Sequence, residues 1–190
     1  MRKVISVALL FFVVALARAL PPDSVLAQGA RDGDAPAWAI AVESPAGWTR
    51  DCCTYAKAIG VNAVLYQGEW IGKPQRVMVL NVWPSKLASV AAEVHADRKR
   101  YAELDPHGKT SSFAVRHPDM PCQASVYEGS DRIDDVLVFC DPGKANGVRL
   151  SWSMTLDASD PTRGALLDAF MQVVMTSHYQ RYVAPPARGG

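Results

Sequence analysis

The stretch from Cys122 to Leu156 constrains the fold most, because it predicts three consecutive antiparallel strands joined by two short turns. Residues typical of turns, including Gly, Asp, Ser, Pro and Asn, fill both connections. Folding about Asp131 places Cys122 opposite Cys140, because each cysteine lies nine positions from that centre. The predicted strands are Cys122–Tyr127, Asp134–Cys140 and Gly147–Leu156.

The third of these strands alternates strictly between apolar and polar residues. This alternation is typical of a strand with one face on the core and one polar face. Arg76–Trp83 is instead apolar on both faces, which is typical of a central strand covered on both sides. The apolar positions of the alternating strand are Val148, Leu150, Trp152, Met154 and Leu156.

Helices are expected over Arg50–Ile59 with Thr49 as its cap, over Lys86–Leu104, and over Pro161–His178. In the two longer segments, apolar residues recur at spacings of three and four, so each helix has one face for the sheet. Hairpin-linked strands followed by such helices predict an α+β fold, a mostly antiparallel sheet sandwiched by helices (α/β/α).

Residues 1–19 have the pattern of a bacterial signal peptide, with a basic start, an apolar run and a small-x-small cleavage site at Ala17–Ala19. The apolar run, Val4–Leu16, has 13 residues, and a membrane-spanning helix needs about 20. We therefore expect cleavage after Ala19, with Ala27 as the alternative. The mature protein is then periplasmic or secreted and has no membrane span.

The remaining chain is expected to form one domain over residues 38–182, after a flexible leader over 20–37 and before a disordered tail over 183–190. Removing the three basic residues of the signal peptide leaves 17 Lys and Arg against 19 Asp and Glu. The resulting net charge of −2 gives no reason to expect a nucleic acid as partner.

Four cysteines in an exported chain favour disulfides and allow three pairings. A bond between the adjacent Cys52 and Cys53 needs a distorted peptide, so geometry disfavours it. The other two pairings connect the Cys52–Cys53 segment to both ends of the hairpin. We favour Cys122–Cys140 if the first helix lies far from the hairpin, and leave the partners of Cys52 and Cys53 open.

The segment Pro45–Ala46–Gly47–Trp48 after the first predicted strand, together with the order of elements, resembles the PsbP/Mog1-like fold. The resemblance implies an antiparallel sheet between helices over about residues 38–180. It also implies a binding role, because members of that group are mostly non-catalytic interaction or assembly factors. The cysteine-containing first helix is a departure from the pattern of the group.

Two flanking loops contain a possible metal site, formed by His107 and His117 with Asp105 and Asp119. These side chains could bind a divalent metal if the loops meet. The alternative interpretation is that they are ordinary turn residues, since Asp-Pro and His-Pro-Asp are common in turns. No catalytic residue and no cofactor are assigned, because the chain has no Gly-x-Ser-x-Gly elbow and no Cys-x-x-Cys.

A possible contact site lies in the glycine-bounded loop that contains Trp70 and Lys73 and follows Tyr66. Exposed aromatic residues favour protein interfaces. The alternative is that Trp70 folds back over the core, because tryptophan is often largely buried.

We therefore expect an exported, non-catalytic protein of the cell envelope that binds another protein, as an accessory, inhibitor or immunity-type factor. The alternatives are a periplasmic metal-dependent hydrolase that uses the Asp105, His107, His117 and Asp119 loops, or a carrier of a small ligand.

The hairpin bond can be tested by a non-reducing tryptic map, because cleavage after Arg132 puts Cys122 and Cys140 in different peptides. We expect these two peptides to be recovered as one linked species that separates on reduction. Recovery of both peptides alkylated without prior reduction would contradict the hairpin bond.

Overall fold

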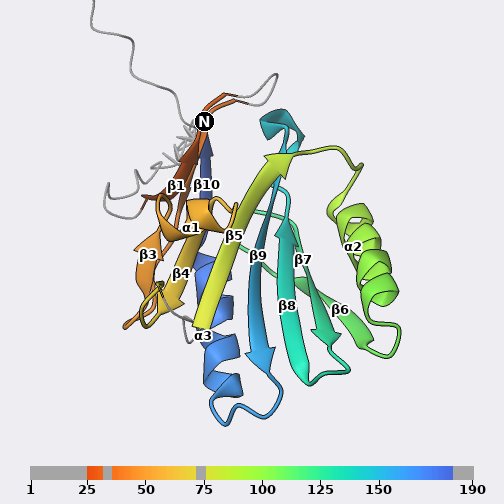
Figure 1. Cartoon of the computed structure of the whole chain (residues 1–190). Coiled ribbons are helices and arrows are strands. Elements are labelled where there is room, and N and C mark those ends of the chain that lie inside the picture. The colour runs from red at the N-terminus through yellow and green to blue at the C-terminus, as the bar shows by residue number, and fades with distance from the viewer. Residues whose placement is uncertain (1–24, 32–35, 72–75, 182–190) are drawn as a thin grey trace, which may run out of the picture.

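A computed structural model describes residues 25–31, 36–71 and 76–181 of the chain. The predicted signal peptide over residues 1–19 and the predicted disordered tail over 183–190 lie outside these residues, whereas the alternative cleavage point at Ala27 lies within them. Seven strands form one antiparallel sheet (Figure 1). In spatial order they are β3 (Thr49–Asp51), β4 (Ala63–Gln67), β5 (Arg76–Pro84), β9 (Val148–Asp157), β8 (Ile133–Cys140), β7 (Cys122–Glu128) and β6 (Lys109–Val115).

The three-stranded stretch predicted from sequence forms β7, β8 and β9, which are neighbours in the sheet. Cys122 pairs with Cys140 in the β7–β8 register, and the two residues form a disulfide. The prediction that Arg76–Trp83 is a central strand is also confirmed, because β5 lies between β4 and β9. The expectation that both of its faces are covered was wrong, because Val79, Asn81 and Trp83 on one face are only half-buried. The turn before β3 has Gly47 at a φ of +80°, where a side chain would be strained.

One face of the sheet forms the main core with helix α3 (Arg163–Thr176). The apolar residues of β9 point to this side, and Trp152 is fully buried among them. Phe170, Val173 and Val174 of α3 are also fully buried. The period-two pattern of β9 and the apolar face of α3 therefore meet, as the sequence predicts.

A second, three-stranded sheet extends this core, with the order β1 (Val25–Gly29), β2 (Trp38–Ala41), β10 (His178–Arg181). Both outer strands pair antiparallel with β2. Residues 25–29 are therefore not part of a flexible leader, and the last helix ends before His178. The predicted leader and the predicted end of the last helix were wrong because β1 and β10 are short and lack alternation. Only their pairing with β2 identifies them as strands.

The opposite face of the large sheet is covered at its two ends. Helix α1 (Tyr55–Ala58) lies against β4, and helix α2 (Val90–Leu104) lies against β7 and β8 (Figure 1). Helices thus lie on both faces of a mostly antiparallel sheet, which confirms the predicted α+β fold. None of the helices in the described ranges is long and apolar enough to cross a membrane.

The predicted starts of the first two helices were wrong. Thr49–Asp51 forms β3, and the Asp51 carboxylate accepts hydrogen bonds from the N–H groups of Cys53, Thr54 and Ala56, so α1 begins only after this turn. Helix α2 begins at Val90, because Ser89 is extended and its hydroxyl accepts the Ala92 N–H at 3.2 Å.

Cys52 and Cys53 form a disulfide with each other, contrary to the expectation that geometry disfavours this pair. The reason is their place in the sheet. They follow β3, which is separated from β7 by four strands, so about 24 Å lies between them and the hairpin cysteines. The cysteines of the hairpin are out of reach, and both residues of the adjacent pair are exposed.

Replacing Phe170 by alanine tests the packing of α3. The ring is fully buried, so Phe170→Ala should lower the free energy of unfolding by about 3–5 kcal/mol. Phe113→Ala is the matched control, because Phe113 on β6 is 49% exposed and should cost much less. Urea denaturation measures both, and equal losses would contradict the packing.

Candidate functional site

The predicted contact residues Tyr66 and Trp70 lie together, but they do not form an exposed patch. Tyr66 is buried and Trp70 is half-buried. The Tyr55 ring of α1 lies edge-on to Tyr66 at 5.5 Å and stacks on Trp70 at 6.0 Å. These aromatic residues therefore hold α1 against β4, which matches the alternative that Trp70 folds back over the core. Lys73 lies outside the described residues.

The predicted metal residues are not brought together. His107 precedes β6 and His117 follows it, so a seven-residue strand of about 20 Å separates the two loops. The Asp105 carboxylate accepts hydrogen bonds from the N–H groups of His107, Gly108 and Ser130, as a turn residue does. Across the described ranges, no three His, Cys, Asp or Glu side chains are grouped to hold a metal ion.

Both ring nitrogens of His117 are occupied by backbone groups. Nδ1 accepts hydrogen bonds from the N–H groups of Asp119 and Met120, so Nε2 must donate to the Ser177 carbonyl, at 3.1 Å. Burial lowers the pKa of His117, and the Asp119 carboxylate only partly opposes that shift. His117 therefore acts as a neutral connector between the loop after β6 and the end of α3.

Helix α2 is anchored to the sheet by polar and aromatic contacts rather than by a broad apolar face. Tyr101 stacks on Tyr127 of β7 at 4.3 Å, and the Tyr127 hydroxyl donates to the Asp97 carboxylate. Burial raises the pKa of Tyr127, and the bond to Asp97 adds to this, so the hydroxyl keeps its proton. Arg98 donates to the Thr110 hydroxyl of β6 at 2.9 Å.

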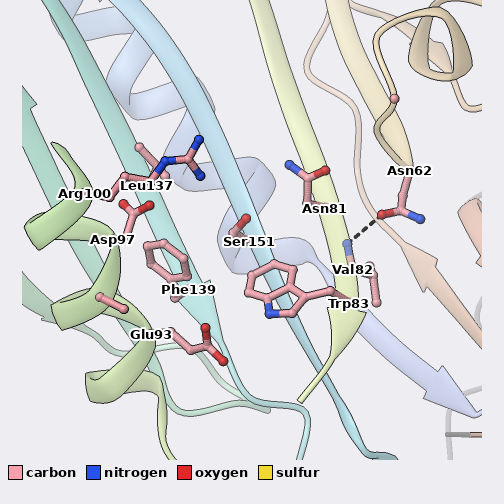
Figure 2. A pocket seen from close by; sticks show the side chains of 12 residues that line it. Asn62, Asn81, Val82, Trp83, Glu93, Asp97, Arg100, Leu137, Phe139 and Ser151 are labelled. Atoms are coloured by element: carbon pink, nitrogen blue, oxygen red, sulfur yellow. Dashed lines mark hydrogen bonds between the residues drawn. The ribbon is translucent and has the colours of Figure 1, made fainter. Parts of the chain in front are cut away.

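These anchors all lie at the β6–β7 end of the sheet, so α2 leaves the central strands partly uncovered. The predicted apolar stripe of this helix is largely unused, because Val94 alone among the α2 residues is buried and Leu104 is 75% exposed. Between α2 and β5 lies an open groove of about 730 Å³, which we call the α2 groove (Figure 2). Its lining comprises Gly60, Asn62, Asn81, Val82, Trp83, Glu93, Ala96, Asp97, Arg100, Leu137, Phe139 and Ser151.

The floor of the α2 groove combines aromatic and small polar side chains. The rings of Trp83 and Phe139 meet edge to face, with centroids 6.2 Å apart. Asn81 and Ser151 are paired in register between β5 and β9, where neither fills the space above the sheet. The Asn62 side chain does not close the groove either, because its oxygen accepts the Val82 N–H at 2.7 Å.

Charged side chains line the α2 side of the groove. Glu93, Asp97 and Arg100 lie on one face of the helix, as their spacing of four and three residues requires. One carboxylate oxygen of Glu93 is buried and accepts no hydrogen bond from any residue of the described part. None of the lining residues is His or Cys. The groove thus has aromatic rings on its floor and charged groups along its α2 side.

Sequence patterns alone did not identify the α2 groove. Trp83 and Phe139 lie in strands that are mostly apolar in sequence, so the pattern predicts them as core residues. The available signal was the pair of small polar residues in the middle of two central strands, Asn81 and Ser151. A central strand covered on both sides would have large apolar residues there.

No family model matches the chain, and no curated protein matches it. Among solved structures, the chain is similar to the solution structure of cyanobacterial PsbP (CyanoP) from Synechocystis sp. PCC 6803. The TM-score is 0.47 at 9% sequence identity, over 87% of this chain and 99% of that chain. This is the weak fold resemblance indicated by the Pro45–Gly47–Trp48 turn.

The connector role of His117 is tested by following its imidazole resonances by NMR. Its pKa should lie below about 6.5, the value for an unperturbed histidine. At pH values between the folded-state pKa and about 6.5, His117 then binds more protons in the unfolded chain than in the folded chain. The His117 contribution to stability is therefore present above about pH 6.5 and is lost as the pH falls through the lower folded-state pKa.

Asp119→Asn provides the comparison, because the carboxylate raises the pKa of His117 and its loss should lower that pKa further. Added zinc should leave the His107 and His117 resonances unchanged. A zinc-dependent shift of both histidines, or a pKa above that of the urea-unfolded chain, would contradict the connector role.

Proposed function

We propose that this chain is an exported, non-catalytic protein of the bacterial cell envelope that binds another protein through the α2 groove. The leader pattern of residues 1–19 supports export. The two disulfides add support, because such bonds persist in oxidising compartments. An accessory, inhibitor or immunity-type role fits a chain that acts by contact alone.

The observation that carries the proposal is the open middle of the large sheet. Trp83 and Leu137 belong to interior strands, yet both are only half-buried, because α1 and α2 cover the ends of this face. Aromatic side chains that are partly exposed in a groove and bordered by polar groups are typical of protein interfaces. A second hollow of about 370 Å³ lies on the same face beside α1, so the contact surface extends along β5 and β9.

The two alternatives have weaker support. A metal-dependent hydrolase would need the Asp105 and His117 loops to meet, and β6 separates them. A carrier of a small ligand would need an enclosed pocket. The α2 groove has the volume of a ligand site but is open to solvent.

Affinity capture with a groove-filling variant tests the proposal. The mature protein is used to capture chains from an envelope extract of the producing bacterium, and the captured chains are identified by mass spectrometry. Leu137→Arg places a long charged side chain on the groove floor, so we expect it to reduce capture of the partner by about tenfold or more.

Phe113→Arg is the matched control, because it introduces the same side chain on exposed β6, outside the groove. It should capture the partner as well as the unchanged protein does. Circular dichroism establishes that both variants fold. Equal capture by folded Leu137→Arg and Phe113→Arg would contradict binding through the groove.

A further inference from the structure

The geometry points to a basic side chain, an arginine or a lysine of the partner protein, as the group that the Glu93 end of the α2 groove receives. This inference rests on the proposed function and specifies the chemistry of the partner. Three features of the groove carry it: an unsatisfied carboxylate oxygen, an aromatic pair beside it and the distribution of charge along α2.

The unsatisfied acceptor is the carboxylate of Glu93. One of its oxygens is buried without a hydrogen-bond donor from the described residues, although the side chain lines an open groove. A buried acceptor without a donor costs free energy, and a carboxylate more than a neutral group. A cationic donor in the groove would balance the charge of Glu93 and, once the Glu93 side chain turns toward the groove, supply the missing hydrogen bond.

The aromatic pair lies at the same end of the groove. Trp83 and Phe139 line it together with Glu93, and Figure 2 shows the carboxylate of Glu93 drawn near both rings. The faces of aromatic rings attract cations, and tryptophan does so most strongly. An arginine or lysine side chain also has an aliphatic stem that can pack on these rings while its charged head reaches Glu93.

The other charges of the groove are consistent with a cation at this end. Arg100 lies seven residues after Glu93, about 10 Å further along the helix. Asp97 lies between them and accepts the Tyr127 hydroxyl. Arg149 neighbours Trp83 in the sheet, but it is buried and paired with Asp141 at 3.0 Å. The lining groups thus carry two negative charges and one positive charge, with Glu93 at the end away from Arg100.

Two short peptides test the inference directly. Acetyl-Gly-Arg-Gly-amide and its citrulline analogue have nearly the same shape, and only the first carries a charge. Binding is followed by NMR at the indole N–H resonance of Trp83, which Trp83→Phe assigns. We expect a saturable shift with the arginine peptide and about tenfold weaker binding of the citrulline peptide, since charge-assisted hydrogen bonds are the stronger ones.

Glu93→Gln removes the negative charge and should weaken binding of the arginine peptide by about tenfold. Glu103→Gln is the matched control, because it makes the same change on an exposed residue of α2 outside the groove and should leave binding unchanged. Equal binding of the two peptides, or equal affinities of the two variants, would overturn the inference.

The result is separable from that of the capture experiment. If Leu137→Arg abolishes capture while the arginine peptide leaves Trp83 unshifted, the groove binds a protein but the inference of a basic side chain is wrong. The opposite outcome is also distinguishable. If binding of the arginine peptide depends on Glu93 while Leu137→Arg leaves capture unaffected, the cation site is supported and the proposed function is contradicted.

Discussion

The pairing of β9 with β5 and β8 is the constraint on which the rest of the structure depends. It fixes which face each residue of the central strands occupies, because a shift by one residue would turn every side chain to the other face. In the observed register Trp152 lies between Leu80 and Val138 and packs on the α3 side. Ser151 is then necessarily on the opposite face, in the floor of the α2 groove.

The two faces of the sheet are consequently stabilised in different ways. The α3 face is a continuous apolar core, to which the small sheet of β1, β2 and β10 adds Leu26 and Ile40. The opposite face is held at its ends by aromatic contacts, Tyr55 with Trp70 beside α1 and Tyr101 with Tyr127 beside α2. Because neither helix reaches the middle, the groove is a product of where these anchors lie.

This difference between the two faces of the sheet explains where the candidate site lies. A contact surface needs apolar groups that water can reach, and such groups are stable only if the rest of the domain is well packed. Here the disulfide between Cys122 and Cys140 and the α3 core stabilise one side of the strands, while the half-buried Trp83 and Leu137 remain available on the other. The polar residues predicted as metal ligands have a different role, since His117 and Asp105 organise the loops at the two ends of β6.

The sequence by itself determined the elements whose signals are local. The alternation in β9, the symmetry of the hairpin about Asp131 and the apolar face of α3 each depend on residues close together in the chain, and together they identify the α+β class. The tertiary structure decided what depends on distant partners. The strands at Val25–Gly29 and His178–Arg181 exist because both pair with β2, and Cys52 bonds Cys53 because β3 and β7 are far apart in the sheet. The groove likewise depends on α2 meeting Tyr127, a contact between residues about 30 positions apart that no periodicity encodes.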